Sequence, residues 1–200
     1  MKNIFSKNRV EAFSDGIFAI IITLLVLEIK VPHIEETHSP AELQKALLGL
    51  LPKVISWIIS FFTIAVIWVN HHKIFKQVKI LDAGIFWWNA MLLLWSSFIP
   101  FPTAVLGDYP DNKTSIVLYG VVMALMAASF SMMRFYILRK PSLLEESVDL
   151  QMFRKGSFMS VLFGPAMYMT GVVFGILHPY LAFIIFTGIP VYFIFSETKN

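Results

Sequence analysis

The chain has 200 residues, of which 57% are hydrophobic and 14% charged, and its mean hydropathy is +0.71. Soluble domains usually have about a quarter of their residues charged, so this composition excludes an ordinary soluble domain and indicates a membrane protein. The absence of cysteine excludes disulfides and cysteine-based metal or nucleophile sites. A net charge of +3, from 16 basic and 13 acidic residues, is too small for a nucleic-acid-binding surface, so no nucleic-acid partner is expected.

The apolar segments predict an all-α membrane protein that forms one membrane domain over residues 1–200. They lack the alternation of apolar and polar residues that barrel strands require. The first charge-free segment, Gly16 to Leu27, is short, so its helix must begin near Val10 and include Glu11 and Asp15. Six spans are predicted, at about 10–29, 52–70, 83–105, 114–138, 156–177 and 179–196.

Helix ends and breaks follow from a few residues. Ser39 and Pro40 predict the N-cap and first residue of a short amphipathic helix in the loop after the first span. Pro179 is expected to open the last helix directly after a tight turn. Pro100 and Pro102 predict a kink or the outer end of the third span, and Pro165 and Pro190 predict kinks.

The basic residues predict the orientation of the six spans. With the N-terminus inside, the outer segments hold 4 of the 16 basic residues, namely Lys30, Lys45, Lys53 and Lys113. The inner segments hold the other 12, namely Lys2, Lys7, Arg9, Lys73, Lys76, Lys79, Arg134, Arg139, Lys140, Arg154, Lys155 and Lys199. Because basic residues concentrate on the cytoplasmic side, both termini are predicted to be cytoplasmic.

The first helix is unusual because it carries an acidic residue, Asp15, that needs a partner inside the membrane. At about 100° per residue, a single stripe of its surface contains Gly16, Ile20, Thr23, Leu24 and Leu27. Ser14 and Asp15 point away from this stripe, towards neighbouring helices. Candidate partners at the same depth are Trp68, Asn70, His71, His72, Trp87, Trp88 and Asn89.

A hydrogen-bonded network of these groups would fix the first helix. Packing alone explains the same pattern, because small bundles use buried acids to hold helices together and Ile/Leu stripes are usually packing surfaces. His71 and His72 also invite a metal site, but adjacent residues on a helix point about 100° apart, so none is expected.

Three segments resemble the transmembrane protein 175 family, the endosomal/lysosomal potassium channels and their prokaryotic relatives. The first is Arg9 followed after three residues by Phe13-Ser14-Asp15. The second runs from Trp68 to Phe75 and contains Asn70, His71 and His72. The third runs from Leu92 to Phe101. The length and predicted topology match one six-helix repeat of the family. In this respect the chain is similar to the prokaryotic members, which have a single repeat.

The resemblance implies a homotetrameric, potassium-selective channel in the cell membrane of a prokaryote, in which the first helices surround a central pore. It implies apolar rings in place of a carbonyl filter, with Ile20 as the narrowest ring and Leu24 and Leu27 further out. Thr23 would offer hydroxyl groups that favour potassium over sodium. The implied structural motif network comprises Arg9, Phe13, Ser14, Asp15, Trp68, Asn70, His71 and His72.

The expected partners are further copies of the chain, the lipid bilayer and monovalent cations. No cofactor or resident metal is expected, and K⁺ is expected only as the permeant ion. The alternative function is a proton-coupled secondary transporter of the inner membrane, although such proteins place ionisable groups near the bilayer midplane. An enzyme is not expected, because no converging set of catalytic groups lies at one depth.

Overall fold

A computed structural model describes residues 6–35 and 39–197, and every regular element in them is a helix. Five helical segments are long and apolar enough to cross a membrane: Lys7–Glu28, Leu51–Gln77, Ala83–Asp108, Lys113–Leu138 and Leu150–Leu177. A shorter apolar helix covers Pro179–Phe195, where the sixth span is predicted. The elements are α1 (Lys7–Leu25), η1 (Val26–Glu28), α2 (Pro40–Gly49), α3 (Leu51–Gln77), α4 (Ala83–Phe98), α5 (Pro100–Asp108), α6 (Lys113–Leu138), η2 (Pro141–Leu143), α7 (Leu150–Val161), η3 (Leu162–Ala166), α8 (Met167–Leu177) and α9 (Pro179–Glu197).

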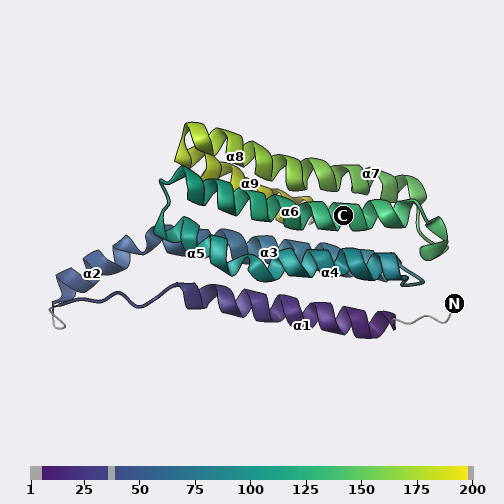
Figure 1. Cartoon of the computed structure of the whole chain (residues 1–200), viewed down its shortest axis with the longest axis horizontal. Helices are drawn as coiled ribbons and strands as arrows, with labels where there is room; N and C mark the ends of the chain where they lie inside the picture. Colours follow the sequence, from purple (N-terminus) through teal and green to yellow (C-terminus); the bar gives the residue numbers. More distant parts are fainter. Residues whose placement is uncertain (1–5, 36–38, 198–200) are drawn as a thin grey trace.

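The long helices lie side by side in three groups (Figure 1). α1 forms one side of the bundle and packs against α3, α4 and α5. α6 packs against α4 and α5 on one side and against α7, α8 and α9 on the other, so it is buried along most of its length. α1 is therefore an outer helix of the single chain, and one of its faces is left open.

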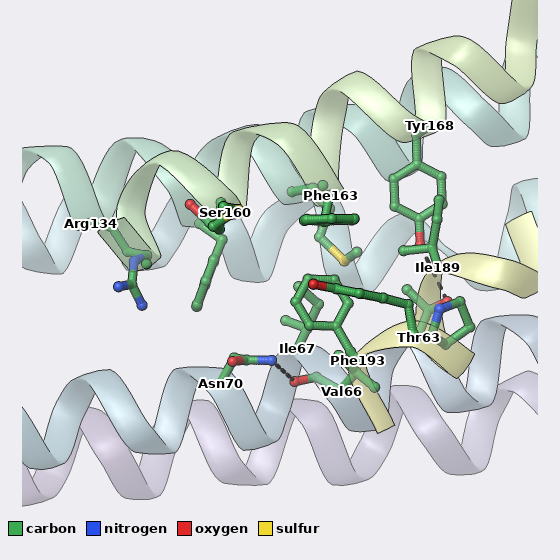
Figure 2. Close-up of a pocket in the computed structure, with 18 of the residues that line it drawn as sticks. Thr63, Val66, Ile67, Asn70, Arg134, Ser160, Phe163, Tyr168, Ile189 and Phe193 are labelled. Carbon is green, nitrogen blue, oxygen red and sulfur yellow. Dashed lines mark hydrogen bonds between the residues drawn. The ribbon is translucent and has the colours of Figure 1, made fainter. Parts of the chain in front are cut away.

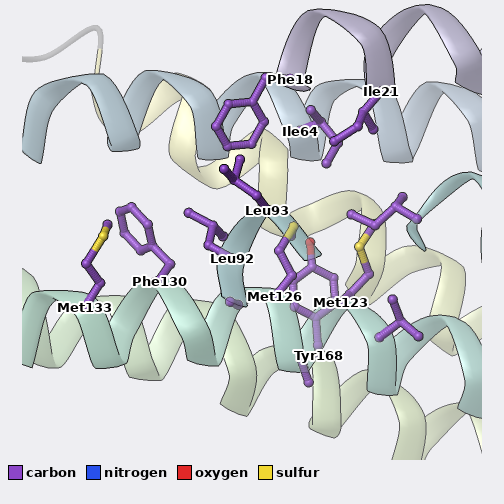
Figure 3. Close-up of a cluster of buried hydrophobic side chains, with 14 of the residues drawn as sticks. Phe18, Ile21, Ile64, Leu92, Leu93, Met123, Met126, Phe130, Met133 and Tyr168 are labelled. Atoms are coloured by element: carbon purple, nitrogen blue, oxygen red, sulfur yellow. The ribbon is translucent and has the colours of Figure 1, made fainter. Parts of the chain in front are cut away.

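The core that holds α1 in place is apolar and well filled. Figure 3 shows Phe18 and Ile21 of α1 directed towards Ile64 of α3 and Leu93 of α4, and all four side chains are buried. Below them, methionine and aromatic side chains from α6 and α8 complete the cluster (Figure 3). Transfer of a side chain of this size from water to the core stabilises the fold by about 1.5–3 kcal/mol. Transfer from lipid brings no such gain, and close packing between the helices stabilises the contact instead.

Several helices are longer than predicted at the end that carries most basic residues. α1 begins at Lys7 rather than near residue 10, and the Lys7 ammonium group donates a hydrogen bond to the carbonyl of Val78 at 2.7 Å. α3 continues past residue 70 to Gln77 because Ile74 and Phe75 are buried. α7 begins at Leu150 rather than residue 156, since Asp149 caps its first turn.

The predicted helix starts and the break at Pro165 fall where expected. Ser39 caps α2 by accepting a hydrogen bond from the amide of Glu42, and α9 opens at Pro179. Pro100 opens α5 after the break from α4. Gly164 has the non-helical angles φ −98° and ψ −106° directly before Pro165, inside a π-helical turn. α9 continues through Pro190, so this proline does not end the helix.

A polar cluster joins the start of α4 to the end of α6. Asp82 accepts hydrogen bonds from Tyr136 at 2.7 Å, from Lys140 at 3.1 Å and from the amide of Ile85 at 3.0 Å. Partial burial raises the pKa of Asp82, but these hydrogen bonds and the charge of Lys140 outweigh burial and hold its pKa below the ordinary value of 3.8. The ionised carboxylate therefore stabilises the folded state.

We expect Asp82→Asn to lower the free energy of unfolding by about 1 kcal/mol at neutral pH, the size typical of a partly exposed charged hydrogen bond. Because the pKa of Asp82 is lower in the folded chain, its stabilisation is present above the unfolded pKa and is lost as the pH falls through the folded value. Thermal unfolding in detergent should show the full difference at pH 7 and a difference that shrinks as the pH is lowered below 3.8. Asp111→Asn, at an exposed position in the α5–α6 loop, is the control, and an equal loss in both variants would contradict the assignment.

Candidate functional site: the first helix and its buried network

α1 has two distinct faces. Its buried face consists of Val10, Ser14, Phe18, Ile21 and Leu25, spaced three or four residues apart. The opposite face carries the predicted stripe: Ile20 is 58% exposed, Leu24 43% and Leu27 66%. Gly16 and Thr23 are exposed on the same helix. The structure thus places all five stripe residues on the face of α1 that its own chain does not cover.

The Thr23 hydroxyl is oriented by its own helix. It donates to the carbonyl oxygen of Ile20 at 2.8 Å and lies 3.1 Å from that of Ala19. Because its proton is used in this way, the lone pairs of the oxygen stay free on the exposed face. An oxygen that offers lone pairs in this way is a ligand for a hard cation.

Three buried polar side chains connect α1, α3 and α4 in one chain of hydrogen bonds. Ser14 donates to the carbonyl of Val10 at 2.8 Å, and the Asn89 amide donates to the Ser14 oxygen at 2.9 Å. The Asn89 oxygen lies 2.8 Å from Nε2 of His71. Since this oxygen can only accept, His71 must carry its proton on Nε2. Ser14, His71 and Asn89 are at most 1% exposed, so each of these bonds is shielded from solvent.

Asp15 has the partner that the sequence requires. The indole N–H of Trp68 donates to its carboxylate at 2.8 Å, and the Trp68 ring stacks on His72 at 6.3 Å between centroids. Next to this pair, the ring of His71 stacks on Phe75 at 4.2 Å and meets Phe18 edge-on at 5.5 Å. Hydrogen bonds and aromatic contacts together fix the rotation of α1 against α3.

Four residues of the predicted network take no part in the described hydrogen bonds between α1, α3 and α4. Asn70 donates to the carbonyl of Val66 in its own helix at 2.9 Å and faces a different part of the molecule (Figure 2). His72 takes part only through its ring contact with Trp68. Arg9 and Phe13 are exposed. They lie on α1 at the end that carries most basic residues, without a part in the buried chain.

Sequence reasoning missed a second buried polar cluster near the middle of the spans. The Ser60 hydroxyl lies 2.7 Å from that of Thr103 and 3.1 Å from that of Tyr119, which joins α3, α5 and α6. Tyr168 donates to Thr63 one turn further along α3 at 3.3 Å. The signal was present: Ser60 and Thr63 are three residues apart and share one face of α3.

Among the residues that the structure describes, no group of three or more His, Asp or Glu side chains is arranged to hold a metal ion. The arrangement is instead that of a helix with one buried face, anchored through Ser14, and one open, mostly apolar face, in a bundle of membrane-spanning helices. A multi-pass membrane protein is the class that this fold defines.

Comparison with known proteins identifies the family. Residues 9–100, which contain most of α1 and all of α3 and α4, match the family model for the endosomal/lysosomal potassium channel TMEM175. A protein of Chamaesiphon minutus named as a potassium channel is 36% identical over 188 residues, which is 92% of each chain. A crystal structure of a lysosomal potassium-selective channel TMEM175 homolog from Chamaesiphon minutus matches with a TM-score of 0.83 and 33% identity, and covers 95% of this chain and 97% of that one. The chain belongs to the TMEM175 family, whose members are ion channels and not enzymes.

An animal relative is more distant and longer. The zebrafish protein named as the endosomal/lysosomal proton channel TMEM175 is 22% identical over 185 residues, which is 90% of this chain but 35% of that protein. The chain therefore spans about a third of this animal relative and almost the full length of the bacterial one.

Proposed function

We propose that the protein is a potassium-selective cation channel of a prokaryotic cell membrane, built as a homotetramer with cytoplasmic termini. The observation that carries this proposal is the open apolar face of α1 with Ile20, Leu24 and Leu27. On a membrane-spanning helix, exposed apolar residues of this size face lipid, another subunit or a pore. The relatives named as potassium channels, which match almost the whole chain, support the pore.

In this proposal a ring of four Ile20 side chains closes the pore. An apolar constriction excludes water, and an ion that enters without its hydration shell encounters a large free-energy barrier. Leu24 and Leu27, one and two turns further along α1, form wider rings. Opening requires the four α1 helices to rotate or spread until hydrated or partly hydrated ions pass.

Selectivity is assigned to oxygen atoms beside this constriction. Thr23 presents the lone pairs of its hydroxyl on the open face of α1, as its bond to Ile20 dictates. Four such hydroxyls replace part of the hydration shell of an ion. Potassium gives up its water more readily than sodium, so weakly held oxygen ligands favour potassium.

We expect Thr23→Val to lower the permeability ratio of potassium to sodium about fivefold, which corresponds to ~1 kcal/mol for a lost oxygen ligand. Valine keeps the size of threonine and removes only the oxygen. The ratio follows from reversal potentials measured with potassium on one side of the membrane and sodium on the other.

Thr170→Val is the matched control, because Thr170 of α8 makes the same kind of bond to its own helix, to Ala166 at 2.9 Å. The control should keep the ratio of the wild type. Equal ratios for all three proteins would remove Thr23 from the selectivity mechanism.

A flux assay tests the function itself against the alternative of a proton-coupled transporter. Purified protein is reconstituted into vesicles loaded with potassium, and efflux is followed over a wide range of potassium concentrations. A channel gives flux that rises with the gradient and does not require counter-movement of protons. Saturable flux that stops when the proton gradient is collapsed would contradict the channel and support the transporter.

A further inference from the structure

A cavity of about 360 Å³ lies on the side of α3 that faces away from α1. It is enclosed by α3, α6, the α7–α8 segment and α9, and it is partly open to the outside. Its volume is at the lower end of the range of about 300–1,000 Å³ for small-molecule sites. None of the residues described in its lining belongs to α1, so the cavity is separate from the open face of that helix.

The kinked segment η3 forms one wall of the cavity. Gly164 approaches α6 so closely that an added Cβ would lie 3.1 Å from the Cβ of Ala127. Gly156 lies beside the Arg134 guanidinium. A Cβ at this position would lie 2.5 Å from Nη2, so the missing side chain leaves room for the guanidinium group. Residues on both sides of the kink, Ser160 and Tyr168, line the space (Figure 2).

One end of the cavity is positively charged. Arg134 is partly buried in α6, and its guanidinium donates to the Ser157 hydroxyl at 3.3 Å and to the Phe153 carbonyl at 3.2 Å. These two bonds and a contact with the Phe153 ring at 4.8 Å use only part of its five N–H donors. Lys73 lines the same end, and the described lining contains no acidic residue. Ionisable groups in membrane-spanning helices pair with opposite charges or with backbone carbonyls. The described contacts of Arg134 are a carbonyl, a hydroxyl and a ring, so none of them supplies a negative charge.

The other end of the cavity is apolar. Figure 2 shows the rings of Phe163 and Phe193 between Arg134 and Tyr168, with Ile189 next to Tyr168 in this view. The Tyr168 hydroxyl is already bonded to Thr63, so it makes no demand on a ligand. Thr63 and Asn70 both line the cavity from α3. Asn70 lies seven positions after Thr63, so the cavity extends about 10 Å along this helix.

We propose that this cavity binds one anionic phospholipid of the surrounding bilayer, with the phosphate at Arg134 and part of one acyl chain beside Phe163 and Ile189. Arginine suits the phosphate because its planar fork donates two parallel hydrogen bonds. Basic pockets between membrane helices on the cytoplasmic side bind acidic headgroups in this way. A lipid is favoured over a soluble anion because the apolar depth would remain unfilled by an anion alone.

Native mass spectrometry of the full-length protein in detergent, titrated with dioleoylphosphatidylglycerol, tests the site. Wild-type protein should retain this lipid at least about tenfold more tightly than Arg134→Gln, which removes the charge-assisted bonds. Ser160→Phe keeps Arg134 but fills the cavity, and it should weaken retention by a similar factor. Arg139→Gln, at an exposed arginine at the end of the same helix, should retain the lipid like the wild type.

Four results would overturn the proposal. Equal retention by wild type, Arg134→Gln and Ser160→Phe would show that the lipid binds elsewhere. An equal loss in Arg139→Gln would show only general attraction between basic residues and acidic lipid. Equal retention of dioleoylphosphatidylcholine would show that the cavity does not recognise the acidic headgroup, and displacement of the lipid by inorganic phosphate alone would show that it does not recognise the acyl chain. Size-exclusion chromatography verifies that each variant is folded. If Arg134→Gln does not fold, the retention measured for Ser160→Phe tests the site by itself.

Discussion

Replacement of Ile20 by asparagine should raise the potassium current through the reconstituted protein at least about tenfold. In the proposed tetramer, four isoleucines on the open face of α1 keep the narrowest part of the pore dry. An amide in each of the four positions lets water enter and offers an oxygen to the ion. Because each 1.4 kcal/mol of barrier corresponds to a factor of ten, even a modest reduction in the desolvation cost produces this change.

The control for this prediction is Ile184→Asn in α9, where an equally exposed isoleucine lies outside α1. It introduces the same polar group at an exposed position of another apolar helix, so it separates an effect on the pore from a general effect on the fold. The current of this control should equal that of the wild type. If Ile20→Asn also leaves the current unchanged, Ile20 is not the constriction.

Replacement of Asn89 by leucine should destabilise the protein by about 2 kcal/mol or detach α1 from the bundle. Leucine has a similar size, but it leaves the Nε2–H of His71 without an acceptor and the Ser14 oxygen without a donor. Both groups are buried, and an unsatisfied buried polar group costs about 1–3 kcal/mol. Two such groups would cost about 2–6 kcal/mol, and because interhelical bonds in membranes are individually weaker, the sum falls at the lower end of that range.

Thermal unfolding in detergent, followed by tryptophan fluorescence, measures the effect. Asn70→Leu is the matched control, because the Asn70 amide bonds only to a carbonyl of its own helix. We expect its unfolding temperature to stay close to that of the wild type. A loss for Asn70→Leu as large as that for Asn89→Leu would mean that the buried chain of hydrogen bonds has no special role.

Much of this site could be predicted from the first helix alone. Its helical periodicity separates the stripe with Ile20 and Thr23 from Ser14, and the structure places Ser14 on the buried face and the stripe on the open one. The charge of Asp15 predicts a partner, and Trp68 is among the expected candidates.

The choice among the candidate partners needed the structure. Trp68, Asn70, His71 and His72 are equally suitable partners by depth in the membrane, because all four lie near the end of the predicted second span. Their rotation about the α3 axis decides: Trp68, His71, His72 and Phe75 are spaced i, i+3, i+4 and i+7 and share one face. Asn70 lies off that face and lines the cavity on the other side of α3.

The helix ends and the cavity depend on contacts between distant segments. α1 and α7 begin earlier than hydropathy predicts, since Lys7 bonds to Val78 and Asp149 caps α7. Hydropathy reports only the average polarity of a stretch of sequence, so it gives no information about these individual hydrogen bonds. Pro165 predicts a kink, but the space beside it exists only because α3, α6 and α9 surround the kinked segment at a particular distance.

The central claim is that α1 lines a potassium-selective pore, and a bilayer recording of the purified protein tests it most directly. Potassium is placed on one side and sodium on the other at equal concentration, and the reversal potential is measured for the wild type and for Ile20→Asn. The account predicts single-channel steps, a reversal potential shifted towards the potassium equilibrium potential, and a larger current in the variant. A reversal potential at zero, or no current at any voltage from folded protein of either kind, would contradict it.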